Sequence, residues 1–148
     1  MINLVKSIGD RQFMALALEL AKKGIGKTHP NPMVGCVVVK NGHIVGQGYH
    51  SKAGGTRAEI QALRRAGDKA KGADMYVTLE PCPMCAQAIS FARIRRLYFG
   101  ATDFKGGGVE NGPKIFSQST CHHRPDVYGG IDENQSSALL RDFFRDRR

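Results

Sequence analysis

Two cysteines and one glutamate are the residues of this sequence whose types and spacing could do chemistry. Cys82 and Cys85 stand three positions apart in LEPCPMC, and Glu59 lies upstream in GGTRAEIQAL. The cysteine spacing places both sulfurs on one side of a first helical turn, whose N-terminus favours thiolates. Such a pair suits two bonds to one zinc ion, and it equally suits a Cys-Pro-x-Cys redox pair of the thioredoxin type.

Glu59 favours the zinc interpretation. Metal-assisted hydrolysis needs three protein ligands, an open fourth position for a water whose pKa the metal lowers, and a carboxylate that moves protons without binding the metal. Zinc deaminases supply these groups with a ligand-x-Glu pattern followed by Pro-Cys-x-x-Cys. This chain fits the pattern except at Arg57, which occupies the position of the first ligand. A guanidinium has no lone pair, so Arg57 cannot bind zinc, and its charge could pair with Glu59 instead.

With these motifs the chain resembles the cytidine/nucleoside deaminase superfamily, and its halves resemble two different branches. The N-terminal half, from THPNPMVGCVVVKNGHIVGQGYHSKAGG to TLEPC, resembles the deaminase domain of bacterial riboflavin biosynthesis. The C-terminal half, from PCPMCAQAISFARIRRLYFGA to LLRDFFRDRR, resembles the tRNA-specific adenosine deaminases. The two-residue gap between the cysteines is usual in the tRNA branch, whereas His50 is usual in the riboflavin branch. Two explanations stay open: a chimera, natural or engineered, joined around residues 75–82, or an intermediate family.

The resemblance implies a fold, a cofactor and a reaction. The fold would be a three-layer α/β/α sandwich with a mixed central sheet, and one zinc ion would be held by Cys82 and Cys85. Water on zinc would attack the amino-bearing ring carbon, while Glu59, the catalytic residue, delivers protons to the ring nitrogen and to the departing ammonia. Asn31 and His50 would line the base or ribose pocket. A homodimer is implied by the resemblance as well.

We expect adenosine in tRNA as the substrate and inosine as the product, with activity impaired by Arg57. The first alternative is deamination of the phosphorylated pyrimidine intermediate of riboflavin biosynthesis. The others are a non-catalytic RNA-binding protein or scaffold with the deaminase fold, and a thiol oxidoreductase in which Glu59 has no role. The side chains that could replace the missing zinc ligand are His29, His50, Cys121, His122 and His123. By the resemblance, the CHH stretch that contains the last three is not a zinc ligand.

The charge of the chain favours an anionic partner. Lysine and arginine number 22 against 13 aspartates and glutamates, a net charge of +9. This suits tRNA or other single-stranded nucleic acid, or else a phosphorylated small molecule. Residues 93–96 (RIRR) and 141–148 (RDFFRDRR) place seven arginines in the second half, with Phe143 and Phe144 among them. Arginines mixed with aromatic residues bind phosphates and bases, and they are equally typical of an amphipathic terminal helix.

Length and composition predict a single deaminase domain over residues 1–148. No apolar run approaches the roughly 20 residues that a membrane helix needs, and the N-terminus lacks the apolar core of a signal peptide. We therefore expect a cytoplasmic protein with no membrane partner. In a reducing compartment the four cysteines are not expected to form a disulfide framework.

The segments around these residues predict the elements that must position them. Apolar spacing predicts helices over 10–24, 56–67 with Thr56 as N-cap, 81–92 and 136–146. Asn41-Gly42 between two β-branched runs predicts a hairpin, and 73–80 and 95–101 read as strands. Residues 103–132 are glycine-rich and are expected to be irregular, which is long for a loop without a function.

Overall fold

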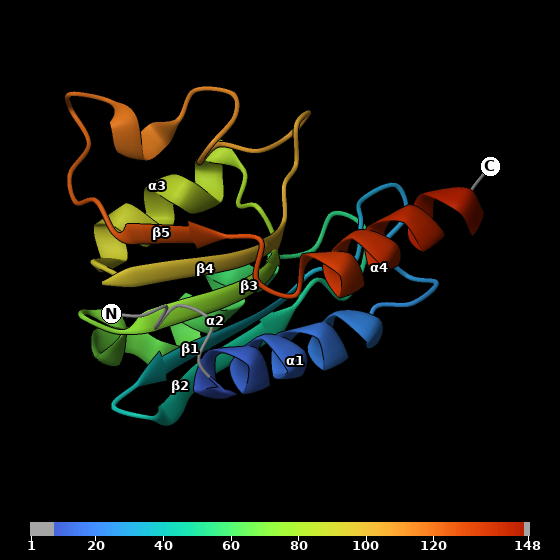
Figure 1. Ribbon diagram of the computed structural model, residues 1–148, viewed down its shortest axis with the longest axis horizontal. Coiled ribbons are helices and arrows are strands. Elements are labelled where there is room, and N and C mark those ends of the chain that lie inside the picture. The colour runs from blue at the N-terminus through green and yellow to red at the C-terminus, as the bar shows by residue number, and fades with distance from the viewer. Residues whose placement is uncertain (1–7, 147–148) are drawn as a thin grey trace.

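The computed structural model describes residues 8–146, which form a five-stranded sheet between two layers of helices (Figure 1). The strands lie in the order β2-β1-β3-β4-β5. Strand β1 runs antiparallel to both of its neighbours, whereas β3, β4 and β5 are parallel to one another. The strand bounds are β1 Gly35–Lys40, β2 His43–Tyr49, β3 Asp74–Leu79, β4 Arg96–Ala101 and β5 Asp126–Gly129.

Two helices cover each face of this sheet (Figure 1). Helices α1 (Ile8–Lys22) and α4 (Glu133–Asp146) lie on one face, and α2 (Ala58–Ala66) and α3 (Pro83–Ala92) lie on the other. Of two short 3-10 turns, η2 (Gly67–Ala70) follows α2, and η3 (Ile115–Ser117) lies between β4 and β5. The predicted three-layer α/β/α sandwich with a mixed central sheet is confirmed.

Alternation along the strands divides the core into two parts. Because successive side chains of a strand point to opposite faces, Val38, Val77 and Phe99 pack under α2 and α3, while Val37, Tyr76 and Tyr98 pack under α1. The rings of Tyr76 and Tyr98 stack with their centroids 4.6 Å apart. The sheet is thus buried on both sides, which explains the continuous apolar sequence of β1.

The predicted hairpin is present, with Asn41 and Gly42 at φ of 52° and 80° between β1 and β2. Two other predictions were wrong. The N-cap of α2 is Arg57, whose side chain makes no capping hydrogen bond, and not Thr56. Residues 103–132 are not irregular throughout, because Asp126–Gly129 form β5, whose pairing with β4 is set by tertiary contact. Among the helices in residues 8–146, none is long and apolar enough to cross a membrane.

Two glycines of β2 let α2 pack directly on the sheet. A Cβ built on Gly46 would overlap the backbone oxygen of Ala62 and lie 2.9 Å from the nitrogen of Ala66. A Cβ on Gly48 would lie 2.8 Å from the backbone oxygen of Ala58. The side of α2 that faces these glycines consists of alanines, so the helix backbone approaches the strand closely. This contact fixes the height of α2 above the sheet, and with it the position of Glu59.

We predict that Gly46→Ala destabilises the fold, because the added methyl group meets the backbone of α2 and cannot be relieved by a change of rotamer. The expected loss is about 1–3 kcal/mol in the free energy of unfolding, the usual cost of overpacking. Urea denaturation measures it. Gln47→Ala is the control, since the Gln47 side chain is exposed on the same strand. Equal stability of the two variants would contradict the close approach of α2 to β2.

Candidate functional site

The predicted site residues gather at one edge of the sheet. Because only β1 runs against its neighbours, the ends of β2, β3, β4 and β5 meet the start of β1 at the same edge. Asn31 precedes β1, His50 follows β2, and Cys82 follows β3. Ligands of α/β proteins commonly bind outside the carboxyl ends of the strands. The topology alone therefore places the predicted residues where such sites occur.

The start of α2 brings Arg57 and Glu59 to this edge. Arg57 is the last residue before the helix and accepts a hydrogen bond on its backbone oxygen from the N–H of Gln61 (3.0 Å). Glu59 lies in the first turn and is only 4% exposed, because α2 packs so closely on β2. A carboxylate near a helix N-terminus is stabilised by the helix dipole, whereas its burial opposes ionisation.

The start of α3 brings the two cysteines to the same place. Cys82 is the N-cap of α3 in an extended conformation, and Pro83 occupies the first turn, where its missing N–H has no helical partner to lose. Cys85 lies one turn further and is fully buried. The Cys85 thiol interacts electrostatically with the side chains of Cys82, Arg57 and Glu59, so the four groups lie close together. Two helix N-termini thus meet with four functional side chains between them.

The surroundings of the two thiols shift their pKa values in opposite directions. The neighbouring Cys85 thiol, the backbone N–H of Cys85 and the charge of Arg57 lower the pKa of Cys82 to about 5, against the effect of burial. The interaction with Cys82, together with burial, raises the pKa of Cys85 well above its usual range. Burial by itself would lower the pKa of Arg57, but Cys82 and Glu59 outweigh it and raise that pKa. At neutral pH the cluster therefore holds one thiolate, one thiol and one guanidinium.

The carboxyl group of Glu59 titrates near neutral pH in this environment. Burial raises the pKa of Glu59 to about 7, and the charge of Arg57 limits the shift. A general acid or base works best when its pKa lies near the working pH. Glu59 is therefore suited to accept and release a proton, which is the role predicted for it.

His50 and Asn31 lie at this edge without belonging to the cluster. His50 is 2% exposed, and burial lowers its pKa; the backbone of Thr56 opposes this shift, and the charge of Arg57 adds to it. Neither of its ring nitrogens makes a well-formed hydrogen bond within residues 8–146. Its backbone N–H donates to Val34 (2.9 Å), while the N–H of Asn31 donates to Thr28 (2.7 Å). A buried imidazole with unused polar atoms is the kind of group that a bound substrate can satisfy.

Glu80 is a site residue that the sequence analysis did not single out. It is 3% exposed, immediately after β3, and its carboxylate accepts five hydrogen bonds from the loop that follows β4. The donors are the backbone N–H groups of Asp103 (3.1 Å), Val109 (3.1 Å), Glu110 (2.9 Å) and Asn111 (3.2 Å), and the side-chain amide of Asn111 (2.8 Å). This loop is thereby held against the Pro81–Cys85 turn. The signal in the sequence was a charged residue at the end of a buried strand, opposite a glycine-rich loop.

The CHH stretch, Cys121–His123, contacts residues of α3 and of the segment that follows it. Cys121 approaches the hydroxyl of Ser90 at 3.6 Å, and a ring nitrogen of His123 lies 2.9 Å from the backbone oxygen of Ile94. His122 lies 3.1 Å from a guanidinium nitrogen of Arg93. The three side chains thus join the loop that leads to β5 to the C-terminal end of α3.

Comparison with known proteins decides which family this geometry belongs to. Residues 8–101 match the model of the cytidine and deoxycytidylate deaminase zinc-binding region. The chain belongs to this family. The matched residues include Glu59, Cys82 and Cys85, so the match extends over the whole cluster and not over the cysteine pair alone. The family consists of zinc-dependent hydrolytic deaminases, which confirms the predicted superfamily and reaction class.

Relatives from two branches of the deaminases resemble the chain. It is 49% identical over 145 residues to a tRNA-specific adenosine deaminase of Agrobacterium fabrum, covering 92% of this chain and 94% of that protein. It is 47% identical over 145 residues to the riboflavin biosynthesis protein RibD of Aquifex aeolicus, covering 91% of this chain but only 38% of that protein. A solved structure of a tRNA:A34 deaminase, from work on A-to-I editing at the wobble position of transfer RNA, superposes with a TM-score of 0.76 at 46% identity. It covers 87% of this chain and 99% of that one.

The residues present do not complete a zinc site of the catalytic kind. Such a site takes three protein ligands, and no group of three or more His, Cys, Asp or Glu side chains that could hold a metal occurs in the described part of the chain. Cys82 and Cys85 offer two sulfurs, but the third neighbour on this side is the guanidinium of Arg57, which cannot donate electrons to a metal. His50, although buried close by, does not complete the set.

We predict that Glu80→Gln destabilises the loop after β4, because an amide offers one acceptor oxygen and an NH2 group that faces other donors. At least two of the five hydrogen bonds are lost, at a cost of about 1–3 kcal/mol for each buried donor left unsatisfied. Urea denaturation gives the total loss, and hydrogen exchange at the N–H groups of residues 109–111 locates it. Glu110→Gln makes the same charge change on an exposed side chain of this loop. If both variants exchange alike, Glu80 does not organise the loop.

We also predict that Arg57→His raises the zinc content of the purified chain to about one ion per chain. The imidazole adds the missing third ligand and removes a cation from the metal position. Elemental analysis measures this, and Arg57→Gln is the control because it removes the charge without adding an imidazole. One zinc per chain in the unmodified protein would contradict the prediction and make another side chain the third ligand, with His50 and His29 the first to be tested.

Proposed function

We propose that this chain is a tRNA-type deaminase in which the reaction, adenosine to inosine, is impaired by Arg57. The observation that carries the proposal is the similarity itself: the chain is 49% identical over 145 residues to a tRNA-specific adenosine deaminase, and 46% identical to a tRNA:A34 deaminase of known structure. The Cys-x-x-Cys spacing points the same way. We propose a single deaminase domain over the whole chain and a cytoplasmic location.

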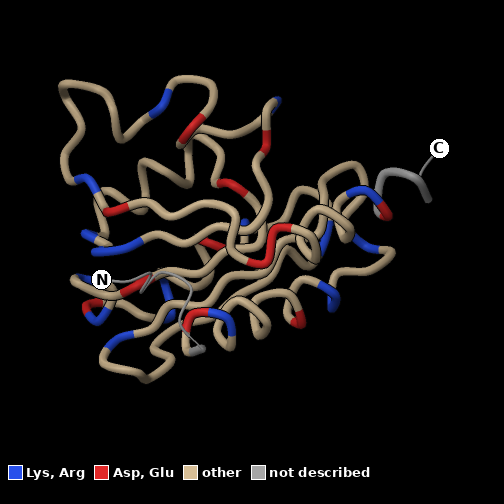
Figure 2. Tube along the Cα trace, viewed as in Figure 1, with Lys and Arg blue, Asp and Glu red and all other residues tan. Residues whose placement is uncertain are grey.

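The positive charge of the chain and an exposed aromatic ring support an RNA substrate. Lysine and arginine outnumber acidic residues by 22 to 13 and occur along most of the described chain (Figure 2). Phe104 is 84% exposed beside Lys105, in the loop that Glu80 holds at the site edge. An exposed ring beside a cation suits stacking on an unpaired base. The arginines and phenylalanines predicted to bind RNA at the C-terminus lie mostly outside the described side chains, since those of residues 143–148 are not described.

In this proposal the substrate-binding, proton-transfer and metal-binding roles belong to different residues. Asn31 and His50 contact the base or ribose, and the Glu80 loop closes the same edge. Glu59, with its pKa of about 7, moves a proton between the attacking water, the ring nitrogen and the departing ammonia. Cys82 and Cys85 hold the family's metal ion only when a third ligand is supplied. Arg57 leaves the fold and the proton shuttle in place and removes that ligand.

A homodimer is part of the proposal and has a surface that fits it. Met84 and Phe91 are 59% and 62% exposed on α3. Being seven positions apart, they lie on one face of the helix, two turns from each other. Two large apolar side chains in line on an outer helix are suited to pack against a second copy of the chain.

The second candidate function is deamination of a phosphorylated pyrimidine in riboflavin biosynthesis. It is favoured by the 47% identity to RibD and by His50, which is usual in that branch. Both relatives match over 145 residues, across the predicted junction at residues 75–82, and this favours an intermediate family over a chimera. A non-catalytic RNA-binding protein is the third candidate, and Arg57 is the observation behind it.

We predict that Arg57→His gains deaminase activity together with zinc, and that Arg57→His combined with Glu59→Ala keeps the zinc and loses the activity. Removal of a positioned acid or base costs about 100-fold or more in rate. Conversion of adenosine to inosine is measured in tRNA by nucleoside analysis, with release of ammonia from the pyrimidine substrate measured in parallel. Product from tRNA alone supports the first function, and product from the pyrimidine alone supports the second.

Two results would contradict this account. If the unmodified chain deaminates as fast as Arg57→His, then Arg57 does not impair the site. If Arg57→His binds zinc and RNA yet forms no product from either substrate, then the non-catalytic function is favoured.

A further inference from the structure

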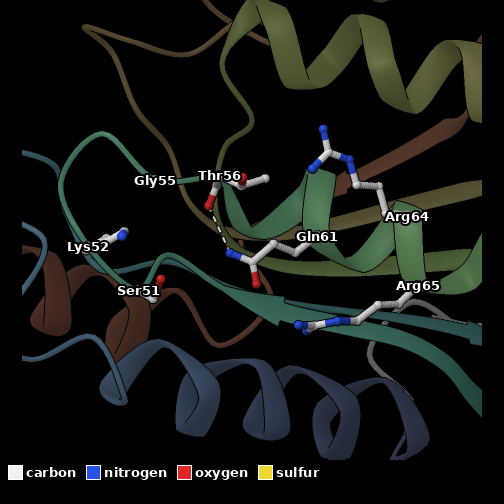
Figure 3. Close-up of a pocket in the computed structure, with 7 residues that line it drawn as sticks. All are labelled: Ser51, Lys52, Gly55, Thr56, Gln61, Arg64 and Arg65. Atoms are coloured by element: carbon white, nitrogen blue, oxygen red, sulfur yellow. Dashed lines mark hydrogen bonds between the residues drawn. The ribbon is translucent and has the colours of Figure 1, made fainter.

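A polar cavity lies on the outer side of α2, and neither Glu59 nor the two cysteines line it. Its volume is about 380 Å³, within the range of about 300–1,000 Å³ that is usual for small-molecule sites. The walls are the segment that follows β2 and the polar side of α2 (Figure 3). Six of its side chains can donate hydrogen bonds: Ser51, Lys52, Thr56, Gln61, Arg64 and Arg65.

The charge of this cavity is positive and not balanced. Lys52, Arg64 and Arg65 line it, and no carboxylate does. The ion pairs found among residues 8–146 involve none of these three cations. Figure 3 shows the guanidinium groups of Arg64 and Arg65 on either side of Gln61, with Ser51, Lys52 and Thr56 on the opposite segment. Three cations around one cavity that no carboxylate lines favour an anion from solution.

Hydrogen bonds from Gln61 and Arg65 hold the backbone that forms the cavity wall. The side-chain amide of Gln61 donates to the backbone oxygens of Tyr49 (2.6 Å) and Thr56 (2.9 Å), and so bridges both ends of the segment. Arg65 donates to the backbone oxygen of Gln47 (2.7 Å), which fixes its guanidinium over β2. The N–H of Gly55 donates to the backbone oxygen of Lys52 (3.0 Å). A fixed frame lowers the cost of ordering these groups around a ligand.

We propose that this cavity binds a phosphate group. Guanidinium groups present paired N–H donors that match phosphate oxygens, and lysine adds a point charge. The hydroxyls of Ser51 and Thr56 add neutral donors on the opposite wall. The phosphate belongs either to a phosphorylated small molecule or to a nucleic-acid backbone, and both offer the same oxygens. Binding here needs neither zinc nor turnover, because none of these side chains belongs to the Glu59 cluster.

The first experiment titrates inorganic phosphate into the full chain by calorimetry in a phosphate-free buffer. The test variant is Lys52→Gln combined with Arg64→Gln, which leaves the structural hydrogen bonds of Gln61 and Arg65 intact. The control is Lys69→Gln combined with Lys114→Gln, two exposed lysines that do not line the cavity, with the same change of net charge. Since a charged hydrogen bond is worth roughly tenfold in affinity, the test variant should bind at least about tenfold more weakly, with the control unchanged. The single variant Arg64→Gln, expected to lose about tenfold, replaces the pair if the pair does not fold.

Competition then separates the two sources of phosphate. Ribose 5-phosphate carries a monoester, and a short single-stranded RNA with a 5′-hydroxyl carries diesters only. Displacement of inorganic phosphate by either one, lost in the test variant, supports the proposal and names the source. No phosphate binding by the unmodified chain, or equal binding by the test and control variants, overturns it. The proposed deaminase activity is unaffected by either result, because the titration uses no substrate and measures no turnover.

Discussion

A buried carboxylate beside the two cysteines imposes the main constraint on this edge of the molecule. Glu80 follows β3 directly and is removed from water, so that its oxygens need donors from the protein. The loop after β4 supplies five, and it can approach only because it is rich in glycine: a Cβ on Gly107 would overlap the carboxylate, and one on Gly108 would lie 2.5 Å from the nitrogen of Pro83. The N–H of Gly108 donates in turn to Pro81 (2.8 Å). The turn that carries Cys82 is thus fixed from both sides, by the sheet and by this loop.

The charges of the catalytic cluster follow from what stands in the metal position. Zinc would bring two positive charges, enough to keep both thiols deprotonated. Arg57 brings one positive charge, and beside it the pKa of Cys82 is lowered to about 5, the pKa of Cys85 is raised, and the pKa of Glu59 is raised to about 7. The guanidinium of Arg57 thus supplies positive charge to this cluster but no lone pair for a metal.

Local pattern predicts most of the fold, and less of the site. Turn chemistry and periodicity, which are local properties, predict the hairpin at Asn41-Gly42. They also predict the two buried strands that follow and all four helices. They do not predict strand β5, because its four residues, none of them buried, gain their structure only from pairing with β4. Glu59 and the cysteines are predicted by spacing. Glu80 is missed since its role rests on five donors more than 20 positions away, and distant contacts leave no local pattern in one sequence.

Helix α2 separates two surfaces that carry different chemistry. Its inner side consists of alanines placed against glycines of β2, so the backbone itself is the contact and no long side chain has to be accommodated. The first turn then directs Glu59 inward beside Arg57, while later turns present Arg64 and Arg65 to solvent on the polar side. Ala58, Ala62 and Ala66 make the close contact with β2, whereas Arg64 is exposed outside it. Glu59 and the anion site proposed at Arg64 thus lie on different sides of one helix, separated by only four residues of the chain.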